Sequence, residues 1–129
     1  MPDHERAMLA YAKLAEISAQ KEQIVGRDKL LVLAGASACR AGWPDVAQRC
    51  RELILANNAV HLIGKHATFA DALRSPDFEP FLKQRERLCS YERAEHLLRG
   101  VNLDPSLPES EHDTSAGEFA LKLLSYEAD

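Results

Sequence analysis

The histidines and cysteines in the second half of the chain are the residues whose chemistry could bind a metal ion. A zinc site brings nitrogen and sulfur ligands together, and His66, Cys89 and His96 are the candidates. Their spacing lacks the paired short intervals of a structural zinc motif, and Ser90 is expected to start a new helix between Cys89 and His96. We therefore predict no metal site and no cofactor, with these three residues kept as weak candidate ligands.

His66 is the more informative of two neighbouring histidines. It lies five residues after His61 in a stretch predicted to be helical, so the two side chains should point about 140° apart and cannot share a ligand. His66 falls in an apolar stripe with Leu62, Phe69 and Leu73, where a buried imidazole needs a hydrogen-bond partner. This is typical of a histidine at the edge of a core, and a ligand pocket beside it is the alternative.

Motifs that support catalysis are missing from the sequence. It contains no glycine-rich phosphate loop, no HExxH and no G-x-S-x-G. Asp71 and Asp77 flank a predicted helix end and could act as acid and base, but such carboxylates usually cap helices or stay solvated. The cysteines Cys39, Cys50 and Cys89 lie in helical patterns and are expected to be reduced and buried. We therefore predict that the chain is not an enzyme.

The elements that must position these side chains are all predicted to be helices. Apolar residues recur with helical spacing, strand-type alternation is absent, and Gly26 and Gly42 act as stop signals for the first two helices. The second helix is apolar nearly all round and should be central. We expect an all-α fold of about seven helices, packed as antiparallel hairpins in an array or as an irregular bundle. The predicted helices cover about residues 3–23, 28–41, 44–57, 59–74, 79–88, 90–101 and 116–126.

The chain divides into three predicted parts. A helical core domain covers residues 1–102, an acidic, proline-containing linker covers 103–114, and a C-terminal amphipathic helix covers 115–129. The linker should be mobile. In the last helix Phe119 and Leu123 form a narrow apolar seam. This seam could dock on the same chain, on a second copy or on a partner, and the sequence leaves that choice open.

Composition favours a compact cytoplasmic domain. The 129 residues carry 16 basic and 20 acidic side chains, for a net charge of -4, which argues against a nucleic-acid partner. No apolar run approaches the roughly 18 residues of a membrane span. The N-terminus lacks the basic start and apolar core of a signal peptide. We therefore expect no membrane association and a cytoplasmic location.

Basic residues gather between Lys83 and Arg99, where acidic residues are interleaved with them. Glu95 and Arg99 have the helical spacing of a favourable ion pair. This segment is typical of a solvated, ion-paired face, and a site for an acidic partner is the alternative. Trp43, the only tryptophan, should pack at a turn between helices, or else serve as an exposed anchor for a partner.

The second and third predicted helices carry small residues at regular places. They read LAG over residues 33–35 and CRAGWPDVA over residues 39–47, and Gly35, Gly42 and Ala47 would let two antiparallel helices approach closely. This pattern resembles a tetratricopeptide (TPR) repeat. A second, weaker echo follows at residues 90–99, with Ala94 in the alanine position. The two alanines are 47 residues apart instead of the repeat's 34, so an extra helix should lie between the hairpins.

The resemblance implies a binding scaffold whose inner groove is lined by the first helix of each hairpin. The family's clamp for C-terminal carboxylates needs Lys and Asn where this chain has Val32 and Ala36, so no such clamp is expected. The groove positions that the resemblance implies are Lys29, Val32, Ala36, Cys39 and Arg40 of one hairpin, with Lys83 and Arg87 of the other.

These observations predict a non-catalytic helical module that binds a partner protein or a second copy of itself. The alternative is a small helical enzyme, or a metal- or ligand-binding bundle, with a site near His66. Nucleic-acid binding through the basic segment is the third hypothesis, and the acidic balance disfavours it. The candidate binding residues are Lys29, Val32, Arg40, Trp43, Lys83, Arg87, Phe119 and Leu123.

Overall fold

All regular structure in the described part of the protein is helical, which confirms the predicted all-α class. The computed structural model describes residues 3–103 and 114–125. No helix in these two ranges has the length and apolar content needed to cross a membrane. The elements are α1 (His4–Gln20), α2 (Ile24–Ala41), α3 (Pro44–Asn57), the 3-10 helix η1 (Leu62–Lys65), α4 (Phe69–Leu73), α5 (Glu79–Leu88), α6 (Tyr91–Gly100) and α7 (Ala116–Leu123).

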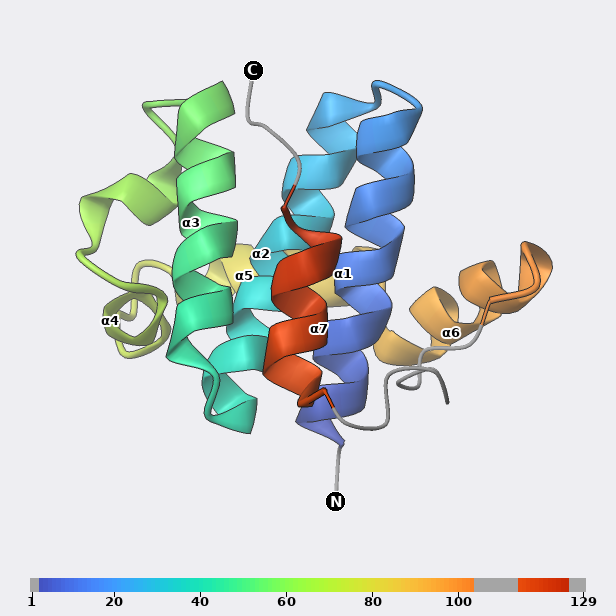
Figure 1. Ribbon diagram of the computed structural model, residues 1–129. Helices are drawn as coiled ribbons and strands as arrows, with labels where there is room; N and C mark the ends of the chain where they lie inside the picture. The colour runs from blue at the N-terminus through green and yellow to red at the C-terminus, as the bar shows by residue number, and fades with distance from the viewer. Residues whose placement is uncertain (1–2, 104–113, 126–129) are drawn as a thin grey trace.

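Three long helices, α1, α2 and α3, form the centre of the molecule (Figure 1). α2 packs against both α1 and α3, and α7 lies in front of α2 in the groove between α1 and α3. α5 packs on α2 and α6 packs on α1, on the side of the molecule away from α7. The helices therefore form an irregular bundle with a four-helix centre and two helices added behind it.

α2 is the central helix, as its composition predicts. Every residue from Leu31 to Ala38 is buried, because α1 and α3 cover its sides and α4 and α5 cover the rest. Alanines make up much of this run and of the facing part of α1. Small side chains let helix axes come close together. Contacts between the backbones of neighbouring helices therefore contribute to the packing of the centre as much as large side chains do.

Residues with left-handed backbone end two of the central helices. Gly42, with φ of 85°, ends α2, and the N–H of Trp43 returns to a carbonyl of the last turn. The prediction that Gly26 stops the first helix is wrong, because Gly26 lies inside α2. α1 already ends at Gln20, and Glu22, with φ of 59°, makes the turn.

The predicted helix over residues 59–74 is also wrong, since only η1 and α4 are helical in this segment. Nδ1 of His61 accepts the N–H of Ile63 at 3.0 Å, which caps η1. The backbone of His66 is extended, and Oγ1 of Thr68 accepts the N–H of Asp71 at 3.1 Å to start α4. Such side-chain bonds to nearby backbone compete with a continuous helix. His61 and His66 therefore do not lie on the same helix.

Gly35 of α2 provides the space in which the segment around α4 packs. The ring of Phe69 lies against it, and a Cβ at Gly35 would come within 2.4 Å of a ring carbon. Phe78 meets Phe69 edge to face, with ring centroids 6.4 Å apart. The close approach that Gly35 permits is therefore to an aromatic ring of α4.

α7 docks on the body of its own chain, against α1 and α3. Its small residues Ala116, Gly117 and Ala120 are buried, whereas Phe119 and Leu123 of the predicted seam are half-buried. The helix therefore buries its small residues most deeply, while Phe119 and Leu123 pack against the core with part of their surface exposed. Most of the predicted mobile linker, residues 104–113, lies outside the described residues, as do residues 126–129 of the predicted last helix.

Candidate functional site: a cleft between α1, α2 and α6

A cleft of about 630 Å³ lies between α1, α2 and the junction of α5 with α6. We call it the main cleft. Three apolar side chains, Ala7, Leu33 and Ala36, form its floor. Its volume lies within the range of about 300–1,000 Å³ that is usual for organic ligands. The polar residues that line it are Asp3, His4, Tyr11, Ser37, Arg40, Glu86, Ser90, Tyr91 and Glu92, of which Tyr11 and Ser37 are buried and the others form the rim.

Hydrogen bonds from α1 hold the α5–α6 junction in place as one wall of this cleft. The Tyr11 hydroxyl donates to the Cys89 carbonyl at 2.8 Å, and Nε of Arg6 donates to the Tyr91 hydroxyl. Ser90 caps the N-terminus of α6 with its side chain, as the sequence predicts. The junction is therefore tied to α1 at Cys89 and Tyr91, on either side of the serine that caps α6.

Carboxylates outnumber cations around the main cleft. Asp3, Glu86 and Glu92 line it together with a single arginine, Arg40. Arg40 and Glu86 form an ion pair of 3.5 Å that connects α2 to α5. The charged side chains that line the cleft therefore carry a net negative charge, and hollows with one predominant sign of charge concentrate the electric field.

Two ionisable groups that meet at the α5–α6 wall, Tyr11 of α1 and Cys89, have raised pKa values. Burial, reinforced by Cys89 and by Glu86 and Glu92, raises the pKa of Tyr11 well above its usual value, so the phenol keeps its proton. Burial also raises the pKa of the Cys89 thiol, although the charge of Arg93 opposes this. A catalytic thiol needs a lowered pKa.

The candidate metal ligands do not come together. Among the described residues, no three His, Cys, Asp or Glu side chains are placed to hold a metal ion. His66 instead packs edge to face on Phe78, with ring centroids 6.1 Å apart. Cys89 caps the end of α5, and His96 is exposed on α6. The cluster of His66, Cys89 and His96 is therefore absent from the described structure.

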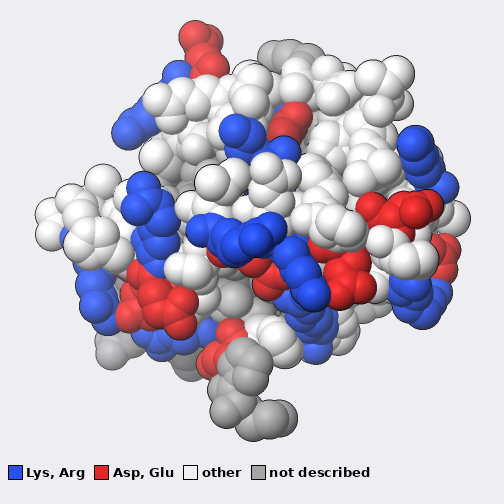
Figure 2. Space-filling model, turned by 180° about the vertical axis from the view of Figure 1, so that it is seen from behind, with Lys and Arg blue, Asp and Glu red and all other residues white. Residues whose placement is uncertain are grey.

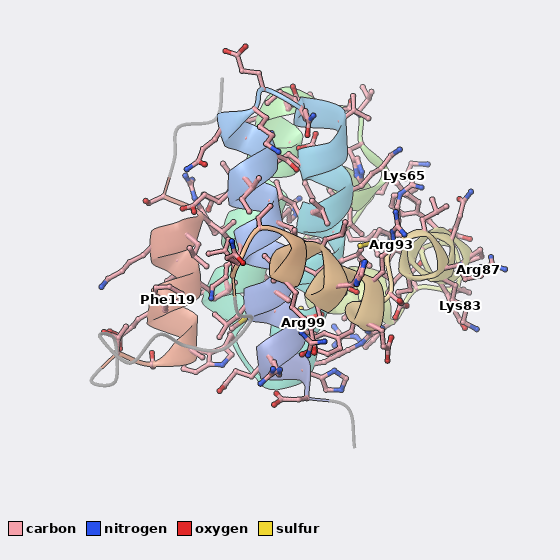
Figure 3. The ribbon with its side chains drawn as sticks, turned by 90° about the vertical axis from the view of Figure 1, so that its right-hand side faces the viewer. Lys65, Lys83, Arg87, Arg93, Arg99 and Phe119 are labelled. Carbon is pink, nitrogen blue, oxygen red and sulfur yellow. The ribbon has the colours of Figure 1, made fainter. Side chains whose placement is uncertain are left out.

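The predicted binding residues are spread over separate faces. Arg40 lines the main cleft, together with Ala36 from the implied groove. Lys83 and Arg87 point outward from α5, while Phe119 lies on α7 at the opposite side of the molecule (Figure 3). Lys83 pairs with Glu79 of its own helix at 2.8 Å. No single groove joins these candidates.

The remaining predicted residues lie at two other places. Lys29 and Val32 border a smaller pocket between α2, the end of α3 and α5, where the fully buried Val32 forms part of the floor. The Trp43 ring packs on Gly117 of α7, and its Nε1 donates to Oε2 of Glu5 at 3.0 Å. Trp43 thus ties the α2–α3 turn to both α7 and α1.

The face opposite α7 carries basic and acidic side chains side by side instead of one block of charge (Figure 2). Arg99 pairs with Glu95 on α6, as their spacing predicts. Arg85 has its guanidinium 4.7 Å from the centroid of the Phe81 ring. The Glu79–Lys83 and Glu95–Arg99 pairs are those of the ion-paired face that the sequence pattern favours, whereas Arg85 is half-buried and forms no ion pair among the described residues.

Sequence reasoning missed the tyrosines and carboxylates of the main cleft. Tyr11 lies beside the apolar stripe of the first helix, where a buried core residue was the natural interpretation. The one available signal was that a buried phenol needs a hydrogen-bond partner, which only the fold could supply.

Compared with models of protein families, with curated proteins and with solved structures, the chain matches none of them.

Proposed function

We propose that this chain is a non-catalytic helical interaction module that binds a segment of a partner protein in the main cleft. The observation that carries the proposal is the cleft itself, with an apolar floor and an acidic, tyrosine-bearing rim. Its walls come from α1, α2 and the α5–α6 junction and are joined by hydrogen bonds, so the cleft is formed before any ligand binds. Preformed sites lose less entropy when they bind.

The chemistry of the rim favours a basic side chain on the partner. Tyr91, Glu86 and Glu92 line the cleft together with the largely buried Tyr11. A lysine or arginine can interact with ring faces and with carboxylates at once. The apolar floor suits a neighbouring aliphatic side chain on the same segment, so the proposed ligand is a short peptide segment with a basic residue beside an apolar one.

Two further observations support a binding role. Ala36 and Arg40, positions that the tetratricopeptide resemblance assigns to a groove, line the main cleft. Cys39, Cys50 and Cys89 are free thiols, which fits the reducing cytoplasm in which we propose that the module works.

The test is selection of peptides from an unbiased display library on the full chain, followed by affinity measurements on charge-reversed variants. We expect the selected peptides to carry Lys or Arg. Glu92→Lys should weaken their binding about tenfold or more, because reversing one charge at the rim costs on the order of 1.4 kcal/mol. Glu118→Lys is the matched control, since Glu118 and Glu92 both lie in the first turn of a helix.

Equal loss of affinity in both variants would show that net charge, not the main cleft, controls binding. Selected peptides without basic residues, or peptides that bind Glu92→Lys as tightly as the unaltered chain, would contradict the proposal. Selection of no peptide at all would also contradict it.

A further inference from the structure

A second, smaller pocket lies between the first half of α2, the end of α3 and the inner side of α5. We call it the small pocket. Its volume is about 160 Å³, which corresponds to roughly five water molecules at about 30 Å³ each. This is below the usual range for organic ligands, so it suits a small ion or one terminal group of a larger molecule. The polar residues around it are Asp28, Lys29, Asn57, Asn58, His61 and Arg85.

Asp28 brings the one carboxylate to the small pocket, and both of its oxygens are already engaged. Nε and Nη2 of the buried Arg27 donate to Oδ1 at 3.1 and 2.9 Å. Nδ2 of Asn57 donates to Oδ2 at 2.8 Å. Arg27 therefore balances the charge of Asp28, and the negative charge of this carboxylate is not free to hold a cation.

Two cations beside the pocket are not balanced in this way. Neither Lys29 nor Arg85 forms an ion pair with any residue in the described ranges. Nε of Arg85 is buried and finds no hydrogen-bond partner among the described residues. The guanidinium carbon lies 4.7 Å from the centroid of the Phe81 ring, a cation–π contact that holds the side chain in place. A buried N–H without a partner costs free energy that a bound acceptor would recover.

His61 adds a neutral donor to these two cations. Its Nδ1 accepts the N–H of Ile63, so the ring proton is on Nε2. Burial lowers the pKa of His61 below its usual value; the charge of Arg85 acts in the same direction, while Asp28 opposes both. At neutral pH the ring therefore offers an N–H without adding charge.

We propose that the small pocket binds a phosphate group through Lys29, Arg85 and His61. Two positive charges and several N–H donors match a doubly charged oxyanion better than a singly charged carboxylate. The site lies apart from the main cleft and shares no lining residue with it, so this proposal does not depend on the proposed function.

The experiment is a titration of the full chain with inorganic phosphate, followed by NMR of the His61 ring at constant ionic strength. We expect a saturable shift and a rise in the His61 pKa when phosphate is bound, because a nearby anion favours the charged imidazolium. Arg85→Gln and Lys29→Gln should each weaken phosphate binding about tenfold. Arg87→Gln, which removes the same charge from the outer side of α5, should leave the affinity unchanged.

Two comparison ligands complete the design. Acetate at the same ionic strength should bind far more weakly than phosphate. A phosphate monoester such as phosphoserine distinguishes the source, since tighter binding than phosphate indicates a phosphoryl group on a larger molecule and weaker binding indicates the free ion. The proposal is overturned if phosphate gives no saturable shift, if acetate binds equally well, or if Arg87→Gln loses as much affinity as Arg85→Gln and Lys29→Gln do.

Discussion

At the scale of single residues, the packing of this protein depends on two glycines that face large aromatic rings. A Cβ at Gly35 would lie 2.4 Å from a carbon of the Phe69 ring, and a Cβ at Gly117 would lie 2.2 Å from a carbon of the Trp43 ring. Neither glycine has a left-handed backbone, so the reason for each is space and not conformation. In contrast, Gly26 has no atom within 4 Å of such a Cβ.

Gly35→Ala and Gly26→Ala should therefore change stability in opposite directions, although both lie in α2. The first adds a methyl group where the Phe69 ring lies, which costs about 1–3 kcal/mol and outweighs a gain in helix propensity of about 1 kcal/mol. The second gains up to about 1 kcal/mol without a clash. Urea denaturation of the two variants and the unaltered chain measures this difference. A change of the same sign in both would show that Phe69 yields easily.

At the scale of elements, α6 and α7 show how two amphipathic helices can differ in docking. α7 buries its small residues in the groove between α1 and α3. α6 packs on α1 through Ala94 and Leu98 and leaves Leu97 and Val101 exposed. α7 is therefore held by close packing of small residues, whereas α6 combines packing on α1 with hydrogen bonds at the α5–α6 junction.

Ala120→Asp tests the docking of α7 in the full chain. Ala120 has no exposed surface, so the substitution buries a carboxylate and should cost on the order of 3 kcal/mol. Trp43 packs on α7 and is the only tryptophan, so its fluorescence should move to longer wavelength when the helix undocks. Ser125→Asp introduces the same group at an exposed position and should have a much smaller effect. Unchanged fluorescence and stability in Ala120→Asp would mean that α7 does not depend on this contact.

At the scale of the whole molecule, the excess of acidic over basic residues comes from residues that lie outside the described ranges. Six of the 20 acidic residues and none of the 16 basic ones lie in residues 104–113 and 126–129, which leaves 14 acidic against 16 basic residues in the described body. The net charge of -4 therefore does not describe the surface of the bundle, on which both signs are interleaved (Figure 2). The preference for a basic ligand that we propose depends on the residues that line the main cleft and not on the net charge of the chain.

Burial also gives the whole molecule a pH limit on the alkaline side. It is the main cause that raises the pKa of Tyr11 and of the thiols Cys39, Cys50 and Cys89. A group whose pKa is raised by folding stabilises the fold fully below its unfolded pKa, and this stabilisation is lost as the pH rises through the folded value. For the thiols the loss begins near the ordinary value of 9.0.

Urea unfolding under reducing conditions should therefore show lower stability at pH 10 than at pH 7. Fully buried Cys50 alone should lower the free energy of unfolding by about 1.4 kcal/mol for each pH unit above its unfolded pKa. Cys50→Ala removes this group, so the variant should lose less stability between the two pH values, even though its starting stability is lower. A decline with pH that is equal in both proteins would assign the effect to other groups.

The sequence by itself determined the class of the fold and most of its helices. Local patterns fix a helix where apolar spacing coincides with a terminal signal, which is the left-handed Gly42 at the end of α2, the first-turn Pro44 of α3 and the capping Ser90 of α6. The Glu95–Arg99 ion pair was also readable, because both partners lie on one helix turn. Each of these features depends on contacts between residues close in the chain.

Only the tertiary structure decided the sites and the segment between α3 and α5. The main cleft brings Tyr11 together with Tyr91, and the small pocket brings Lys29 together with Arg85. Helical periodicity relates only residues that are close in the sequence, so it could not predict these pairs. The helix expected over residues 59–74 does not form as one element, because the side chains of His61 and Thr68 accept backbone N–H groups within it. The Phe69 ring also packs against Gly35 of α2. Burial against α2 there outweighs helix propensity, which is worth less than about 1 kcal/mol for an ordinary residue.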